Sequence, residues 1–342
     1  MRTNKIYVMA LAWVIGMCTA CTTDVETHEA NELGYIFFHA DVNSRVTLTM
    51  GNTVSQFGVL GYKYGNYWES EATTALPNVF TDDSKGYNQP VTLTGSLYQY
   101  TPVKTWEPGF HYSFFGYHPY STSFPESGNV TLSDKDYTGI PYINYTVESW
   151  TEQTGMTDIM TACSIDDPKP NSDEVNLTFK HRLYALEVKA RNFNDNTEYI
   201  RNVSITITNL KYKSVQIFLD GNVSLPAPST YAGTYALTTT GNAITLPAYN
   251  VDDSTTGQPI SATDDDKRLL LIPQEGGITG YITFDWYDGS KWTKKEQSFE
   301  IVRTMEEGHF YNFIIDFADD VISITFVDSD QWDEKTVEVE FE

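Results

Sequence analysis

Alternation of apolar and polar residues is the dominant pattern of this chain, and it predicts short β-strands along most of its length. Apolar side chains occupy every second position in segments such as 36–42, 203–207 and 322–326. Successive side chains of an extended strand point to opposite sides, so each segment would present one apolar face. Turn-forming pairs such as Asp220-Gly221 and Asp288-Gly289 lie between such runs. No long segment has apolar residues at helical spacing.

Many short strands without intervening helical segments predict an all-β fold of sandwich type. The alternation breaks at residues 164–174, SIDDPKPNSDE, which contain two prolines and four acidic residues. This composition is typical of a linker. We therefore expect an N-terminal β-sandwich over residues 33–165 and a C-terminal β-sandwich over residues 175–342, each of ordinary domain size.

The first twenty residues differ from the rest of the chain. Arg2 and Lys5 precede an uncharged run over residues 6–17. The run is too short to span a bilayer, and a cationic start followed by a short apolar core is typical of an export signal. We predict that residues 1–20 form a signal peptide.

Cys21 is the expected site of lipid attachment. Small residues precede it, whereas Met17 precedes Cys18 and fits a small-residue cleavage pocket poorly. The segment resembles a bacterial lipoprotein signal, in which the cysteine at the new N-terminus carries the lipid and anchors the chain to a membrane. An ordinary secretory signal is the alternative. Residues 21–32, polar and acidic, would form a leash between anchor and body.

Net charge limits the partners that the chain can bind, and cysteine content limits the disulfides that it can form. The whole chain has a formal charge of −24, and losing Arg2 and Lys5 with the signal would leave −26. Such an acidic body repels nucleic acid, so we expect no nucleic-acid partner. After Cys21 only Cys163 remains, so lipidation of Cys21 would leave no intramolecular disulfide.

Sequence motifs for catalysis or metal binding are missing. The histidines do not fall at metal-ligand spacing, and neither HExxH nor GxSxG occurs. The acidic runs 264–266 and 328–330 lack the glycine and the closing glutamate of a calcium loop, so we expect solvated carboxylates there. We predict a protein that is not an enzyme and needs no cofactor or metal.

Two aromatic clusters suggest an alternative function. The stretches 61–68, GYKYGNYW, and 284–292, FDWYDGSKW, place tyrosine and tryptophan beside glycine and polar residues. Exposed aromatic faces beside polar groups can stack on sugar rings. Trp68 and Trp292 are therefore candidate glycan contacts of a surface lipoprotein that binds carbohydrate and does not polymerise.

Several phrases, taken in order, resemble the fimbrillin-like proteins of Bacteroides-type bacteria, the major and minor fimbrial subunits and their surface relatives. They are FFGYHPY (114–120), TDIMTA (157–162), LTFKHRLYALEVKA (177–190), LLLIPQ (269–274), EEGHFYNFIIDF (306–317) and VISITFVDSDQW (321–332). The resemblance implies two tandem transthyretin-like β-sandwiches. It also implies a structural subunit of a fimbria at the outer membrane, with adhesion to a host or bacterial surface ligand as the function of the assembly.

The resemblance further implies assembly by strand exchange. A trypsin-like protease cuts the lipidated precursor after an arginine, the first strand leaves, and a C-terminal strand of another subunit takes its place. Here the cut would follow Arg45, in an expected exposed turn. The inward face of the displaced strand would comprise Ile36, Phe38, Ala40 and Val42. The donor would be TVEVEF (336–341), through Val337, Val339 and Phe341, with 321–327 as an extension. The alternatives are a solvated Arg45 and a C-terminal strand that completes its own sandwich.

Overall fold

The computed structural model describes twelve segments of the chain. They are residues 34–42, 54–80, 87–121, 130–147, 158–167, 174–192, 199–236, 244–245, 258–259, 269–318, 321–328 and 337–338. Within them the regular structure is almost entirely β, with one short helix, α2 (Trp68–Glu71). The predicted all-β class is confirmed. None of the described residues forms a helix long and apolar enough to cross a bilayer.

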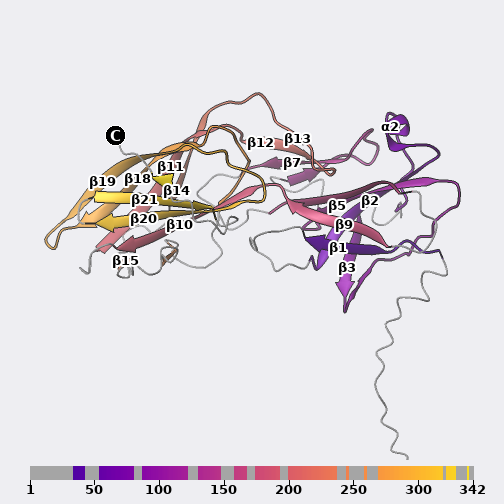
Figure 1. Ribbon diagram of the computed structural model, residues 1–342, viewed down its shortest axis with the longest axis horizontal. Coiled ribbons are helices and arrows are strands. Elements are labelled where there is room, and N and C mark those ends of the chain that lie inside the picture. Colours follow the sequence, from indigo (N-terminus) through magenta and orange to yellow (C-terminus); the bar gives the residue numbers. More distant parts are fainter. Residues whose placement is uncertain are drawn as a thin grey trace, which may run out of the picture.

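The molecule is elongated, with a barrel at one end and a 6-stranded and a 5-stranded sheet at the other (Figure 1). The barrel strands, in order around the ring, are β1 (Phe38–Val42), β4 (Leu97–Gln99), β3 (Gln89–Thr94), β2 (Gln56–Tyr64), β5 (His111–His118), β8 (Met160–Asp167) and β9 (Val175–His181). Pairing of β1 with both β4 and β9 closes the ring. Alternate residues of β9 are buried, as expected for a strand with one face in a core.

Two sheets form the opposite end of the molecule. One contains, in order, β16 (Gln258–Pro259), β10 (Tyr184–Asn192), β20 (Phe310–Ala318), β21 (Val321–Asp328) and β22 (Val337–Glu338), with β17 (Leu269–Leu271) also on β10. The other contains β14 (Tyr231–Ala236), β11 (Tyr199–Leu210), β18 (Ile278–Tyr287) and β19 (Trp292–Ile301), with β15 (Ile244–Thr245) on β11. The ring centroids of Phe284 and Phe317, and those of Phe299 and Phe313, lie 4.9 Å apart, so the sheets share an apolar interior.

A smaller sheet combines strands from both halves of the sequence. Its order is β13 (Val223–Ser224), β12 (Ser214–Phe218), β7 (Tyr142–Thr146) and β6 (Val130–Leu132). β7 and β12 are antiparallel and paired over five residues. Segments about seventy residues apart in sequence therefore form one sheet, and the two halves of the chain are interleaved here.

The predicted boundary at residues 164–174 does not separate two structural units. β8 continues through Asp167, and β9, which begins directly after the expected linker, pairs with β8 and with β1. Asp166 and Asp167 thus belong to the end of β8, and the two prolines fall in sequence between strands that are neighbours in the barrel. A loop between two strands interrupts the alternation just as a linker between two domains does, so composition did not distinguish the loop from a linker. The chain leaves the barrel after β9, at Arg182.

Two loops of similar sequence lead into central strands of the two halves. EPGFHY (107–112) precedes most of β5, and EEGHFY (306–311) leads into β20. In each loop the glutamate N–H donates to the hydroxyl of the tyrosine five residues on, at 2.8 Å for Tyr112 and 3.0 Å for Tyr311. Each glycine has a positive φ, a conformation that glycine adopts without strain. A glycine turn with a hydrogen bond from glutamate N–H to a tyrosine hydroxyl therefore accompanies the start of a core strand in each half of the molecule.

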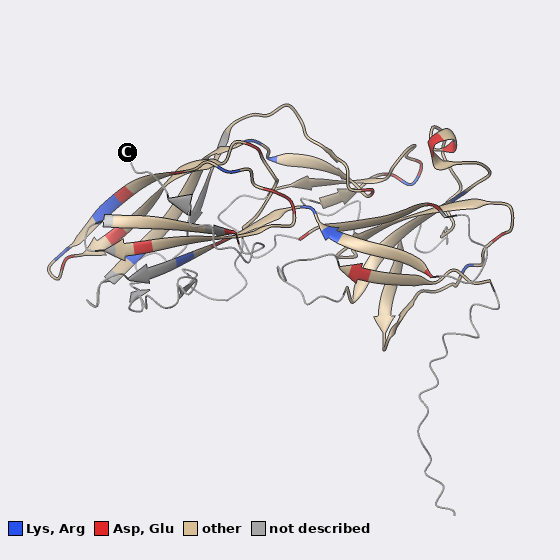
Figure 2. Cartoon of the chain, in the orientation of Figure 1, with Lys and Arg blue, Asp and Glu red and all other residues tan. Residues whose placement is uncertain are grey.

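Charged residues lie mainly in loops, on α2 and along β19, whereas most strand surfaces carry few of them (Figure 2). β19 ends its sheet in the part of the chain described, and its outward residues include Lys294, Glu296 and Glu300. Charges along an edge strand disfavour unspecific pairing with another sheet. β19 is therefore poorly suited to unspecific pairing with the sheet of another molecule.

Candidate functional site

The first strand is built into the barrel core. Ile36, Phe38 and Ala40 are buried and Val42 packs against the same cluster, so the predicted inward face does lie inside. The Phe38 ring lies among four other rings, with centroid distances of 5.4 Å to Phe114 and 5.7 Å to Tyr100. This strand supplies a large part of the apolar filling at its end of the barrel.

The two edges of β1 are held differently. Along one edge, residues 38–42 pair in parallel with residues 175–179 of β9. Along the other edge, the described pairing with β4 is the single pair of Phe38 with Tyr98. The loop at 104–106 continues this side, where Ile36 N–H donates to Lys104 O at 2.8 Å and Trp106 N–H donates to Gly34 O at 2.8 Å. The continuous ladder therefore lies on the β9 side alone.

Tyrosine hydroxyls reach the main chain of β1 on its weakly paired side. Tyr100 O–H donates to Ile36 O at 2.9 Å and accepts from Lys104 N–H at 3.2 Å. The Tyr98 hydroxyl lies 2.9 Å from Val54 O and 3.3 Å from Ala40 O. Sequence reasoning missed both residues, because a tyrosine in an apolar alternation indicates a core position and not the destination of its hydroxyl.

The outer face of β1 carries weak ionic contacts. His39 Nε2 lies 3.2 Å from Asp41 Oδ2, and His39 Nδ1 lies 3.9 Å from Glu174 Oε2, all on exposed or half-exposed side chains. Exposed pairs of this kind contribute about 0–1 kcal/mol. The attachment of β1 therefore depends on its buried face and its main chain.

Removal of β1 would leave a defined vacancy. Phe57, Phe80 and Phe114, which contact Phe38, would lose a neighbour, and β9 would present an unpaired edge. Exposed apolar pockets at alternate positions beside unpaired backbone groups favour the addition of another strand. The geometry can thus accept an extended segment in place of β1.

The predicted donor segment is described only in part. β22 pairs with β21 through Phe326 with Val337 and Thr325 with Glu338, and it is the last strand of its sheet among those described. Val339 and Phe341 lie outside the described residues. The expected extension 321–327 belongs to β21, which pairs with β20 over its whole length and buries Ile322, Ile324 and Phe326, and its part in donation stays a prediction.

Other predicted processing sites lie outside the described residues. They are the signal peptide 1–20, the lipidation site Cys21, the leash 21–32 and the cleavage candidate Arg45. Val42, the last residue of β1, is the final described residue before the segment that contains Arg45. Cys163, on β8, is a free and half-buried thiol whose pKa is raised chiefly by burial. Burial disfavours the reactive thiolate.

Trp68 is not a glycan contact. It is 5% exposed at the start of α2, and its ring packs against Tyr62, Tyr64 and Phe115 at centroid distances of 5.0–5.7 Å. Asp166 Oδ1 accepts its backbone N–H at 2.7 Å. Tyr62 and Tyr64 of this stretch are core because strand β2 buries most of its residues, whereas Tyr67 lies beyond β2 and is exposed.

Trp292 is half-buried rather than open. The Arg201 guanidinium lies over its ring, with the carbon 4.1 Å from the centroid, and Tyr287 lies 5.1 Å away. Arg201 in turn contacts Asp285, with Nε 3.2 Å from Oδ2. One face of the predicted stacking ring is thus already occupied by a side chain of the protein.

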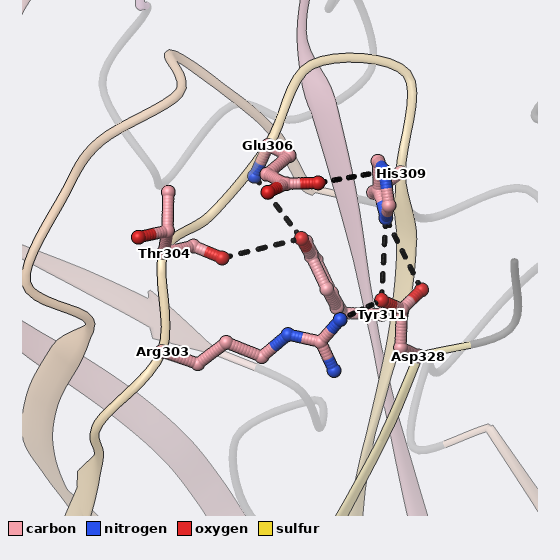
Figure 3. A network of polar contacts seen from close by, with 6 residues as sticks. All are labelled: Arg303, Thr304, Glu306, His309, Tyr311 and Asp328. Carbon is pink, nitrogen blue, oxygen red and sulfur yellow. Dashed lines mark hydrogen bonds and ion pairs between the residues drawn. The ribbon is translucent and has the colours of Figure 1, made fainter. Parts of the chain in front are cut away.

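A polar network surrounds the end of β21, where solvated acids were expected (Figure 3). Asp328 is buried and accepts from Arg303 Nη2, and His309 Nδ1 lies 3.2 Å from Asp328 Oδ2. His309 Nε2 lies 3.1 Å from Glu306 Oε2. The expectation of a solvated Asp328 is wrong, because Arg303 and His309, both from the loop before β20, contact its buried carboxylate. Among the described residues, no group of three or more metal-ligating side chains is arranged to hold an ion.

Comparison with known proteins gives consistent results. The model of the fimbrillin-like family matches residues 44–332. The fimbrium subunit Fim1C of Phocaeicola vulgatus is 25% identical over 218 residues, which cover 61% of this chain and 55% of that protein's length. The crystal structure of a fimbrial protein from Bacteroides vulgatus has a TM-score of 0.60 at 19% identity, covering 90% of this chain and 99% of the other. The structural similarity supports the fold, and the family match spans most of the sequence. The chain belongs to the fimbrillin-like family.

Proposed function

We propose that this protein is a structural subunit of a cell-surface fimbria that supports adhesion. It is made as a precursor anchored in the outer membrane through a lipid on Cys21, and it joins other fimbrial subunits by strand exchange. Membership of the fimbrillin-like family and the similarity to a protein named as a fimbrium subunit support the fimbrial role. This role is mechanical, and neither a cofactor nor a catalytic group takes part in it.

The observation that carries the exchange proposal is the way β1 occupies its groove. The family match covers neither β1 nor β22, so the exchange is argued from geometry. Burial of Ile36 and Phe38 contributes about 1.5–3 kcal/mol each, and the β9 ladder adds main-chain hydrogen bonds. A barrel without β1 would regain this free energy by accepting another extended segment with apolar residues at alternate positions.

The donor in this proposal is the C-terminal segment that includes β22. It alternates Val337, Val339 and Phe341 with glutamates, and its described part lies at a sheet edge. Donor and acceptor are different surfaces of one subunit, so each contact leaves a free donor and a free groove. Such heterologous contacts propagate as an open filament.

Cleavage after Arg45 by a trypsin-like protease starts the exchange in this proposal. Arg45 follows the end of β1 by three residues, so a cut there would separate the whole strand from the rest of the barrel while leaving β2 intact. The released segment would carry Cys21 and its lipid with it. The body of the subunit would then be free of the membrane and able to join a filament.

Limited trypsin digestion of residues 22–342 tests the proposal. We expect a single early cut at Arg45, followed by a ladder of heat-labile multimers on a gel. Arg45→Ala should remain uncut at this position and monomeric, whereas Val337→Asp should be cut normally but form few multimers. Clean cutting of the unmodified chain that yields only monomers would refute strand exchange. Electron microscopy of expressing cells, with and without Arg45→Ala, tests fimbria formation in vivo.

A further inference from the structure

One main-chain pair beside β1 contains an inserted side-chain hydroxyl. Ile36 N–H donates to Lys104 O at 2.8 Å, as in an ordinary antiparallel pair. The return bond from Lys104 N–H to Ile36 O is replaced by two bonds, because Lys104 N–H donates to the Tyr100 hydroxyl and that hydroxyl donates to Ile36 O. Tyr100 thus completes a pairing that the backbone alone leaves open.

A second hydroxyl lies further along the same edge. Tyr98 lies on β4, and Tyr100 directly follows that strand. The Tyr98 hydroxyl lies 3.3 Å from Ala40 O and 2.9 Å from Val54 O. Its single proton serves one of these acceptors at a time, so Tyr98 is the weaker contact to β1. The contacted carbonyls belong to Ile36, two residues before β1, and to Ala40 on β1, and both residues have inward side chains.

We infer that Tyr100, assisted by Tyr98, is a backbone anchor that holds any strand in the β1 groove, whatever the side chains of that strand. A carbonyl oxygen is present at every residue, so the hydroxyl contacts do not depend on the sequence of the occupant. For a strand from another subunit the inference rests on the proposed exchange. The fitting partner is an extended segment that has apolar residues at alternate positions and offers main-chain carbonyls to both tyrosines.

The surroundings of Tyr100 suit this role. Its ring is 6% exposed and lies 5.5 Å from Phe80 and 5.7 Å from Phe38, which fixes the direction of the hydroxyl. Burial raises the pKa of Tyr100 above the usual value for tyrosine. The hydroxyl therefore keeps its proton, and stays a donor, throughout the physiological pH range. Loss of the hydroxyl would leave both Ile36 O and Lys104 N–H with one hydrogen bond fewer.

Hydrogen exchange of the intact exported chain, residues 22–342, tests the anchor without polymerisation. We expect the amides of β1 to exchange about tenfold faster in Tyr100→Phe than in the unmodified chain. Tyr112→Phe is the matched control, because this buried hydroxyl in the same barrel accepts from Glu107 N–H instead of contacting β1. The control should leave β1 exchange unchanged. Equal β1 exchange in both variants would overturn the inference.

Two further measurements complete the test. If Tyr100→Phe does not fold, Tyr98→Phe is measured in the same way, and β1 exchange as slow as in Tyr112→Phe overturns the inference. In trypsin-treated samples, Tyr100→Phe should shorten the lifetime of multimers about tenfold relative to Tyr112→Phe. Equal lifetimes overturn the claim for an incoming strand. A complete lack of multimers in the unmodified chain contradicts the proposed function, while the exchange of β1 in the monomer still decides whether Tyr100 is an anchor.

Discussion

At the scale of single residues, Arg182 links three parts of the molecule. Its Nε donates to Thr161 Oγ1 of β8 at 2.7 Å, and its Nη1 lies 3.1 Å from Glu307 Oε1 and 3.5 Å from Gly221 O. The side chain is 6% exposed. Gly221 has a φ of +99°, which favours glycine, and a Cβ there would lie 2.5 Å from a guanidinium nitrogen of Arg182. Arg182 thus joins the barrel, the small sheet and the loop before β20.

Replacing Arg182 should destabilise the whole fold. We expect Arg182→Ala to lower the free energy of unfolding by about 2–3 kcal/mol, because Thr161 and Gly221 lose buried hydrogen bonds. Glu307 is 43% exposed and can turn to water, so Glu307→Gln should cost less than about 1 kcal/mol. Urea denaturation measures both. Similar losses in the two variants would show that the ion pair, and not the buried bonds, carries the stabilisation.

The two tryptophans predicted to contact glycans should differ in their effect on stability. We expect Trp68→Ala to cost about 3–5 kcal/mol, because it removes a large buried side chain. Trp292→Ala should cost about 1 kcal/mol, since it loses a half-buried ring and its contact with Arg201. Thermal unfolding followed by circular dichroism measures both changes. A Trp68→Ala protein as stable as the unmodified chain would contradict the core position of this ring.

At the scale of elements, β1 and β22 differ from their neighbours in how they are held. β21, which precedes β22, is paired with β20 over eight residues and contributes three buried apolar side chains, Ile322, Ile324 and Phe326. β22 has two described pairs. β1 has a full ladder on one side and hydroxyl contacts on the other. In the proposed exchange, β1 is the strand that leaves and β22 is part of the donor.

The buried face of β1, and not its outer face, should control how firmly the strand is held. We expect Phe38→Ala to accelerate hydrogen exchange of β1 by at least tenfold, because its ring fills space among Phe57, Phe80 and Phe114. His39→Ala, the adjacent outward position, should change it less than threefold. Mass spectrometry of peptides that cover residues 34–42 reports both rates. Equal rates would mean that the pocket does not retain the strand.

At the scale of the whole molecule, buried tyrosines link the fold to pH. Burial raises the pKa of Tyr87 and Tyr311 to about 12, and it also raises those of Tyr62, Tyr100 and Tyr117. In an unfolded chain these groups titrate near pH 10. The unfolded state therefore binds fewer protons than the native state above this pH, and stability must fall as the pH rises.

An alkaline titration should consequently show cooperative unfolding. Stability from the buried tyrosines should be complete below about pH 10 and should decrease as the pH rises towards 12. We expect tyrosinate absorbance at 295 nm to rise in a step that coincides with loss of near-ultraviolet circular dichroism. Gradual ionisation of every tyrosine near pH 10 with the fold intact would contradict this expectation.

Local sequence was sufficient to predict strands and their faces. Ile36, Phe38 and Ala40 face inward as the alternation indicates, because the two-residue period of a strand depends only on neighbouring residues. It did not predict the tyrosine hydroxyls beside β1, because their acceptors lie 44 to 64 residues away in sequence. Sequence separation also concealed the contacts of Trp68 with Phe115 and Asp166, although its other ring contacts, Tyr62 and Tyr64, are close in sequence.

The all-β class, the apolar faces of the strands and, through the recurring phrases, the fimbrillin-like family could be predicted from the order of the residues. The tertiary structure alone decided that β9 completes the barrel, that β7 pairs with β12, and that Asp328 is buried between Arg303 and His309. Strand partners depend on packing across long sequence separations, and a carboxylate is buried only where charges from another segment compensate it. Neither condition is written in the local pattern of residues.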